Sequence, residues 1–166
     1  MRLADVFLSF PSVLMALLVV AVLGPGAVNV TVAITISLAP GFARVVRVRA
    51  LVVRDAPYVR AATNLGVPSA RNLLRHIAPN TLAPLLILAT MNIGTAIITG
   101  ASLSFIGLGV QPPAADWGAM LAQSRDYLGA SWTLAVFPGG AITLTVLAVS
   151  IIGREVQARY EGRQAR

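Results

Sequence analysis

The feature that most constrains the fold is a set of four long apolar segments, at about residues 3–23, 29–43, 81–105 and 133–152. A helix needs about 20 apolar residues to cross the hydrocarbon core of a bilayer. Inside lipid, a chain must satisfy its backbone hydrogen bonds internally, which favours helices. The sequence therefore predicts an all-α, polytopic membrane helical bundle with about four transmembrane helices.

The composition fits a membrane protein and offers little material for catalysis. The chain is 57% hydrophobic and 11% charged, whereas soluble domains are about 25% charged. It has no cysteine, so disulfides, thiolate nucleophiles and thiolate metal sites are excluded. One histidine and six carboxylates are spread along the chain. We therefore expect neither an enzyme nor a metal site.

The positions of the basic residues predict how the chain is oriented. All thirteen are arginine, and those of the 44–76 region are Arg44, Arg47, Arg49, Arg54, Arg60, Arg71 and Arg75. Four more lie in the basic tail, 154–166, whereas the turn at 24–29 has none. Cytoplasmic loops carry an excess of positive charge. We expect both basic regions, and both termini, on the cytoplasmic side of the inner (plasma) membrane.

The 44–79 connector has the pattern of two short helices joined at a glycine. Pro57 suits a first helical turn, and Gly66 suits the end of a helix. Residues spaced i, i+3, i+4 and i+7 give each helix an apolar stripe: Tyr58, Ala61, Ala62 and Leu65, then Ala70, Leu73, Leu74 and Ile77. The opposite face of the second helix carries Arg71, Asn72, Arg75 and His76. Such a pair can lie on the inner leaflet or dock on a cytoplasmic partner.

Several stretches resemble one family of permeases. Arg60-Ala61-Ala62, Gly66 and Pro79 are similar to the EAA motif of bacterial ABC importer permeases. RHIAPN (75–80), SLSFIGLGVQPPAADWGAML (102–121), FPSVLMALLVVAVLGPG (10–26) and LAVFPGGAITLTVLA (134–148) resemble the dipeptide, oligopeptide and nickel branch, in its second permease subunit. Two positions depart from the motif: Arg60 stands where it has glutamate, and Ala78 where it usually has leucine.

This resemblance implies a permease subunit that forms the translocation path for peptides or a related small substrate, possibly nickel. The implied partners are ATP-binding subunits, a second permease subunit, an external substrate-binding protein and the lipid bilayer, with no nucleic acid. The 55–79 loop would couple the chain to the ATPase, through Arg60, Ala61, Ala62, Gly66, Leu73, His76 and Pro79. The sequence has no GxxxxGK[ST] phosphate loop. We therefore expect that the chain binds no cofactor and that a partner uses the ATP.

The third apolar segment carries a polar stripe, at Asn92, Thr95, Thr99 and Ser102. Their spacing places these side chains on one helical face. Polar residues of this kind join helices through interhelical hydrogen bonds. The resemblance implies instead that they line the path of the substrate. Both interpretations hold if the stripe faces a subunit interface.

The length of the chain differs from the family pattern of about six spans. Four segments suggest a permease that is truncated at its N-terminus, with a transmembrane domain at 1–153, an outer connector at 106–131 and a cytoplasmic tail at 154–166. Two alternatives remain: a non-functional truncated fragment, and a membrane protein whose basic loop only binds anionic lipid.

Overall fold

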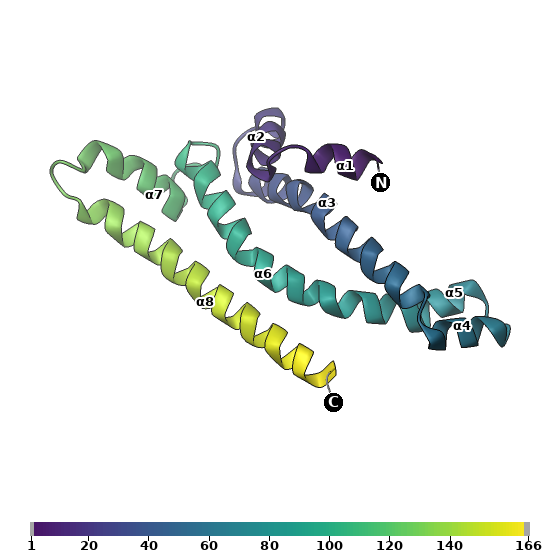
Figure 1. The fold of residues 1–166 in the computed structure, drawn as a ribbon. Coiled ribbons are helices and arrows are strands. Elements are labelled where there is room, and N and C mark those ends of the chain that lie inside the picture. The colour runs from purple at the N-terminus through teal and green to yellow at the C-terminus, as the bar shows by residue number, and fades with distance from the viewer. Residues whose placement is uncertain (1, 165–166) are drawn as a thin grey trace.

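The computed structural model describes residues 2–164, and these residues form helices and no β-strand (Figure 1). The all-α prediction is confirmed. The longest helices are α3 (Ala27–Arg54), α6 (Ala78–Phe105) and α8 (Thr133–Gln164). Within the described residues, three helices are long and apolar enough to cross a membrane: Ala27–Arg54, Ser69–Phe105 and Thr133–Arg159.

The first apolar segment, expected as one crossing at 3–23, is broken into α1 (Arg2–Leu8) and α2 (Ser12–Leu23). Pro11 occupies the N-cap of α2. A proline lacks an amide hydrogen and disfavours helical dihedrals in the residue before it, so the helix stops at this point. The twelve residues of α2 span about 18 Å, less than the roughly 30 Å hydrocarbon core. The single crossing is thus replaced by two shorter helices.

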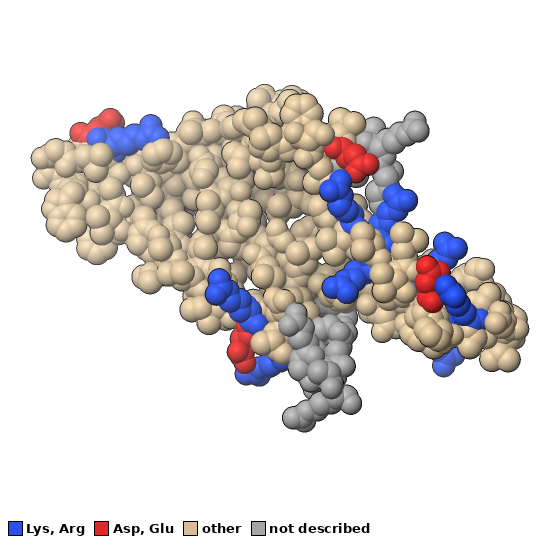
Figure 2. Space-filling view, in the orientation of Figure 1, with Lys and Arg blue, Asp and Glu red and all other residues tan. Residues whose placement is uncertain are grey.

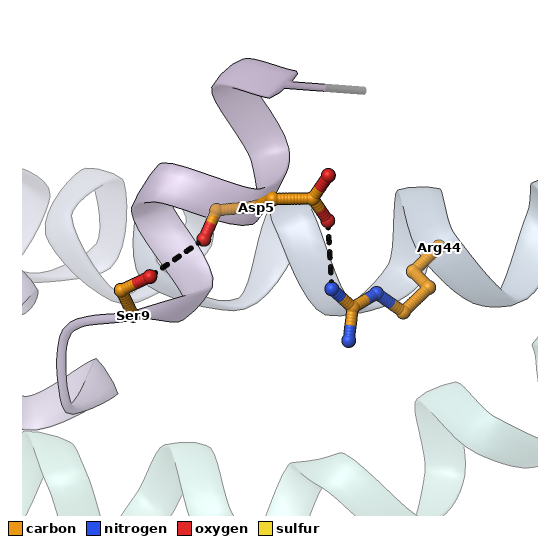
Figure 3. Close-up of polar contacts among 3 residues, drawn as sticks. All are labelled: Asp5, Ser9 and Arg44. Carbon is orange, nitrogen blue, oxygen red and sulfur yellow. Dashed lines mark hydrogen bonds and ion pairs between the residues drawn. The ribbon is translucent and has the colours of Figure 1, made fainter.

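An ion pair connects α1 to α3 (Figure 3). One guanidinium nitrogen of Arg44 lies 2.7 Å from a carboxylate oxygen of Asp5, and both side chains are exposed. The Ser9 hydroxyl, just beyond the end of α1, donates a hydrogen bond to the Asp5 carbonyl oxygen at 2.9 Å. Of these two contacts, the ion pair joins α1 to α3, between residues 39 positions apart in the sequence.

A small core joins α2, α3 and α6. Its buried members are Ala16, Val20, Val30, Ala33 and Leu103. The backbone amide of Gly26, in the turn between α2 and α3, donates to the Leu108 carbonyl oxygen just beyond α6 at 3.4 Å. The start of α3 and the end of α6 therefore lie together at one end of the molecule.

Glycines allow α6 and α8 to pack closely. A Cβ atom at Gly94 would lie 3.4 Å from Val146, and one at Gly153 would lie 3.6 Å from Thr90. Small residues permit such close approach between membrane helices. Gly153 was expected near the end of the last span, but α8 continues beyond it to Gln164. Most of the predicted tail therefore extends the helix, and residues 165 and 166 lie outside the described residues.

The outer connector folds back over the ends of α6 and α8 as α7 (Trp117–Ser124) and the short η2 (Arg125–Tyr127). Asp116 caps α7, because its carboxylate accepts a hydrogen bond from the Ala119 amide at 2.9 Å. The Arg125 guanidinium carbon lies 3.7 Å from the centre of the Phe105 ring, a cation–π contact that ties η2 to α6.

Candidate coupling surface and polar stripe

The first connector helix, α4 (Pro57–Asn64), begins and ends where the sequence predicts. Pro57 stands in its first turn. Gly66 has φ +81°, and its amide donates to Thr63 while the Val67 amide donates to Ala62. These two hydrogen bonds define a Schellman motif, which needs the left-handed dihedrals that glycine adopts without strain. The helix end at Gly66 is therefore confirmed.

The sequence patterns predict a 44–79 connector that is separate from the third apolar segment at 81–105. In the structure the two are joined, because the second connector helix continues into that segment. It begins as α5 (Ser69–Asn72), widens into a π-helical turn, η1 (Leu73–Ile77), and continues as α6. A proline ring clashes with the carbonyl four residues earlier. A π-helical turn just before Pro79 relieves that clash. The connector is thus continuous with a membrane-spanning helix at this end and, because α3 extends to Arg54, at its other end.

Partly buried polar contacts hold the two connector helices together. Asn72 is 4% exposed, and its amide nitrogen donates to the Thr63 hydroxyl at 3.0 Å. Thr63 in turn donates to the Val59 carbonyl at 2.9 Å, and Val59 is itself buried. The Asn72 side-chain oxygen has no hydrogen-bond partner among the described residues. At the open end of the pair, the Tyr58 and His76 rings meet edge to face at 6.2 Å.

These contacts correct the predicted faces of the helices. Asn72 was expected on an outward polar face with Arg71, Arg75 and His76, but it points inward to α4. Val59 and Thr63, which the sequence analysis did not select, form the other half of this contact. A polar residue among arginines gave no signal that it pairs with a threonine nine positions earlier.

The predicted apolar stripes lie largely on the outside of the helix pair. Leu65 is 84% exposed, Leu74 72% and Leu73 52%. Ala61 and Pro79 are also exposed, whereas Ala62 and His76 are half-buried. Arg60 is exposed and lies 3.7 Å from Asp55. We call Arg60, Ala61, Leu65, Leu73 and Leu74 the coupling surface. It combines apolar and positive groups at the far end of the molecule from α7 (Figure 1).

The arginines gather toward that same end. In Figure 2, most of the blue side chains lie over the end of α3, over α4 and α5 and over the end of α8. At the opposite end, over α7 and η2, blue and red side chains lie next to each other (Figure 2), and η2 holds Arg125 followed by Asp126. The charge asymmetry expected from the sequence is therefore an asymmetry between the two ends of one elongated molecule.

The four residues of the polar stripe do not line one continuous hollow. Asn92 contributes to a groove with α1 and α3, whereas Ser102 contributes to another with α7 and α8. Thr99 is buried and Thr95 is exposed. The Asn92 amide and the Ser102 hydroxyl donate to carbonyls of their own helix, at Leu88 and Ile98. Along α6, the stripe therefore faces α1 and α3 at Asn92 and faces α7 and α8 at Ser102.

Membrane-length helices and one strongly basic end are features of a polytopic membrane protein. The chain belongs to the family described as binding-protein-dependent transport system inner membrane component, whose model matches residues 1–165. It is a multi-pass inner-membrane protein.

Two relatives illustrate the similarity. The glutathione transport system permease proteins GsiD of Escherichia coli O1:K1 / APEC and of Shigella flexneri serotype 5b (strain 8401) are each 47% identical to the chain over 153 residues. These residues are 92% of this chain and 50% of each relative. The chain thus spans about half the length of the curated relatives that it matches.

Proposed function

We propose that the chain acts as the transmembrane permease subunit of an ATP-binding-cassette importer and couples to a separate ATPase through its 55–79 loop. The observation that carries this proposal is the coupling surface, whose leucines are exposed. Exposed apolar patches of this kind mark sites of interaction with partners. The family description, which names a binding protein, supports an external substrate-binding partner.

The mechanical part of the proposal rests on the continuity of the helices. Since α5, η1 and α6 form one uninterrupted helical stretch, a force applied at Leu74 reaches the membrane without crossing a flexible loop. ATP-driven closure of the partner would thus tilt α6 and reorient the path through the membrane. The chain itself would bind no cofactor and would not act as an enzyme.

The substrate and the orientation are parts of the same proposal. The relatives are named for glutathione transport, which supports a peptide or a related small molecule, with a second permease subunit completing the path. We place the basic end, with both termini, in the cytoplasm because positive charge is retained on that side. Asn92, Thr95, Thr99 and Ser102 would then face the path or the second permease subunit.

A proline substitution at Gly66, the turn between α4 and α5, tests the coupling role. Gly66→Pro removes the amide that bonds to Thr63 and cannot adopt φ +81°. We expect ATP-dependent uptake of a labelled dipeptide to be lost while the protein still inserts in the membrane.

Ser69→Pro is the matched control. It adds a proline three residues away, at the first helical position, after a residue whose ψ of 142° already suits a following proline. Uptake should persist in this variant. Normal uptake by Gly66→Pro would contradict the coupling role.

A further inference from the structure

A groove of about 400 Å³ lies between α3, α6 and α8 near the basic end of the molecule. Two helical faces form its walls. Val45, Arg49, Val52 and Val53 line it from α3, and Asn80, Pro84, Ile87, Leu88 and Met91 line it from α6. Tyr58 of α4 and Gln157 of α8 complete the lining.

Helix lengths place the polar end of this groove at the depth of lipid headgroups. Arg49 lies 22 residues beyond the start of α3 at Ala27, and Asn80 lies 25 residues before the end of α6 at Phe105. At 1.5 Å per residue these separations are about 33 and 38 Å. The hydrocarbon core is about 30 Å thick. Both side chains therefore lie at its boundary if the opposite ends of α3 and α6 lie at the other.

The rest of the groove lies within the hydrocarbon layer. Met91 is 14 residues from Phe105, about 21 Å along α6, and Ile87 and Leu88 lie between Met91 and Asn80. The groove is therefore apolar toward the middle of the membrane and polar at its surface. This polarity matches an amphiphile that stands parallel to the helices.

The charge of the groove selects the headgroup. Among the residues that the structure describes, none that lines the groove is acidic, and Arg49 makes no ion pair. An arginine at this depth has a cationic head next to the phosphate layer and an aliphatic stem along the helix. By contrast, the described residues that line the groove of Asn92 include no charged residue.

From these observations we propose that the groove binds one anionic phospholipid. Its phosphate pairs with Arg49 and accepts a hydrogen bond from the Tyr58 hydroxyl, and an acyl chain lies along Ile87, Leu88 and Met91. Because Tyr58 also contacts His76, the bound lipid braces the coupling helices against the membrane. Binding of this lipid does not depend on the transport function proposed above.

Lipid selectivity provides the first test. The protein, purified in detergent with whatever subunits it retains, is titrated with phosphatidylglycerol or phosphatidylcholine and analysed by native mass spectrometry. We expect phosphatidylglycerol to be retained preferentially and Arg49→Gln to weaken that retention about tenfold, the effect of one lost charged hydrogen bond.

Arg47→Gln is the matched control, since Arg47 lies on the same helix, is exposed and does not line the groove. It should leave retention unchanged. Equal losses in the two variants would indicate general surface attraction and overturn the site. Equal retention of the two lipids by the unaltered protein would overturn it as well.

Cross-linking in the native membrane distinguishes a lipid from a protein occupant. A photoreactive benzoylphenylalanine in place of Ile87 should give an adduct with the mass of a phospholipid. An adduct with a helix of another subunit would show that the groove is a protein interface, and it would overturn the lipid assignment.

Discussion

At the residue scale, the contact between Thr63 and Asn72 decides how the connector helices α4 and α5 face each other. Burial of an amide is costly unless its polar atoms are paired, and here the nitrogen is paired while the oxygen is not. A polar contact of this kind fixes one relative position of two short helices, where an apolar contact would tolerate several.

Substitutions at these two positions should be strongly non-additive. Thr63→Val leaves the buried Asn72 amide without any partner, and we expect it to destabilise the protein by about 1–3 kcal/mol. Adding Asn72→Leu removes the unpaired amide and should recover most of that loss. Thermal unfolding in detergent measures both effects. Additive losses in the double variant would contradict the pairing.

The Asp5–Arg44 ion pair should contribute little stability by itself. Both side chains are 57% exposed, and exposed pairs contribute about 0–1 kcal/mol. We expect Asp5→Asn to lower stability by less than about 1 kcal/mol, and the exchange Asp5→Arg with Arg44→Asp to restore the contact. A chemical cross-link between α1 and α3 monitors their proximity. A loss of several kcal/mol in Asp5→Asn would show that the pair is buried by a partner.

At the element scale, glycine positions decide which helices approach closely. Gly118 of α7 packs on α6 so tightly that a Cβ atom there would overlap the Ala101 carbonyl oxygen. That neighbour is backbone and cannot move aside without displacing α6. The position of the outer connector therefore depends on one missing methyl group.

Gly118→Ala should displace α7 and destabilise the protein by about 1–3 kcal/mol, the range for overpacked sites. Gly140→Ala is its control, because a Cβ atom at Gly140 meets nothing within 4 Å. It should be neutral or slightly stabilising, as alanine favours helices. Melting temperatures of the two variants provide the comparison, and equal values would refute the close contact.

The same scale shows what the sequence could predict. The Gly66 helix end was predictable because a local backbone requirement, φ +81°, is met by one residue type. The helix break at Pro11 and the unbroken helix through Pro79 could not be predicted from the sequence. A proline can end one helix and yet be accommodated in another by a π-helical turn. The inward position of Asn72 depends on its hydrogen bond with Thr63, a tertiary contact that sequence periodicity does not reveal.

At the scale of the whole molecule, the basic end carries the features that the proposed coupling role needs. Figure 2 shows most of the arginines at this end. The exposed Leu73 and Leu74 and the groove-lining Arg49 belong to helical stretches that continue into the membrane segments, whereas α4 is separated from the helices on either side of it. Many other apolar side chains are exposed along α8, among them Leu144 at 69%. Those side chains are suited to lipid or to a second permease subunit, whereas the coupling surface is suited to a partner outside the bilayer.

Site-directed photocross-linking from the coupling surface tests this account most directly. Benzoylphenylalanine would replace Leu74, with Leu144 as the control because its exposure is nearly the same, 69% against 72%. In membranes that contain the complete transport system, we predict an adduct between position 74 and an ATP-binding subunit, and none between position 144 and that subunit. The same ATPase adduct from both positions, or from neither, would contradict the assignment of the coupling surface.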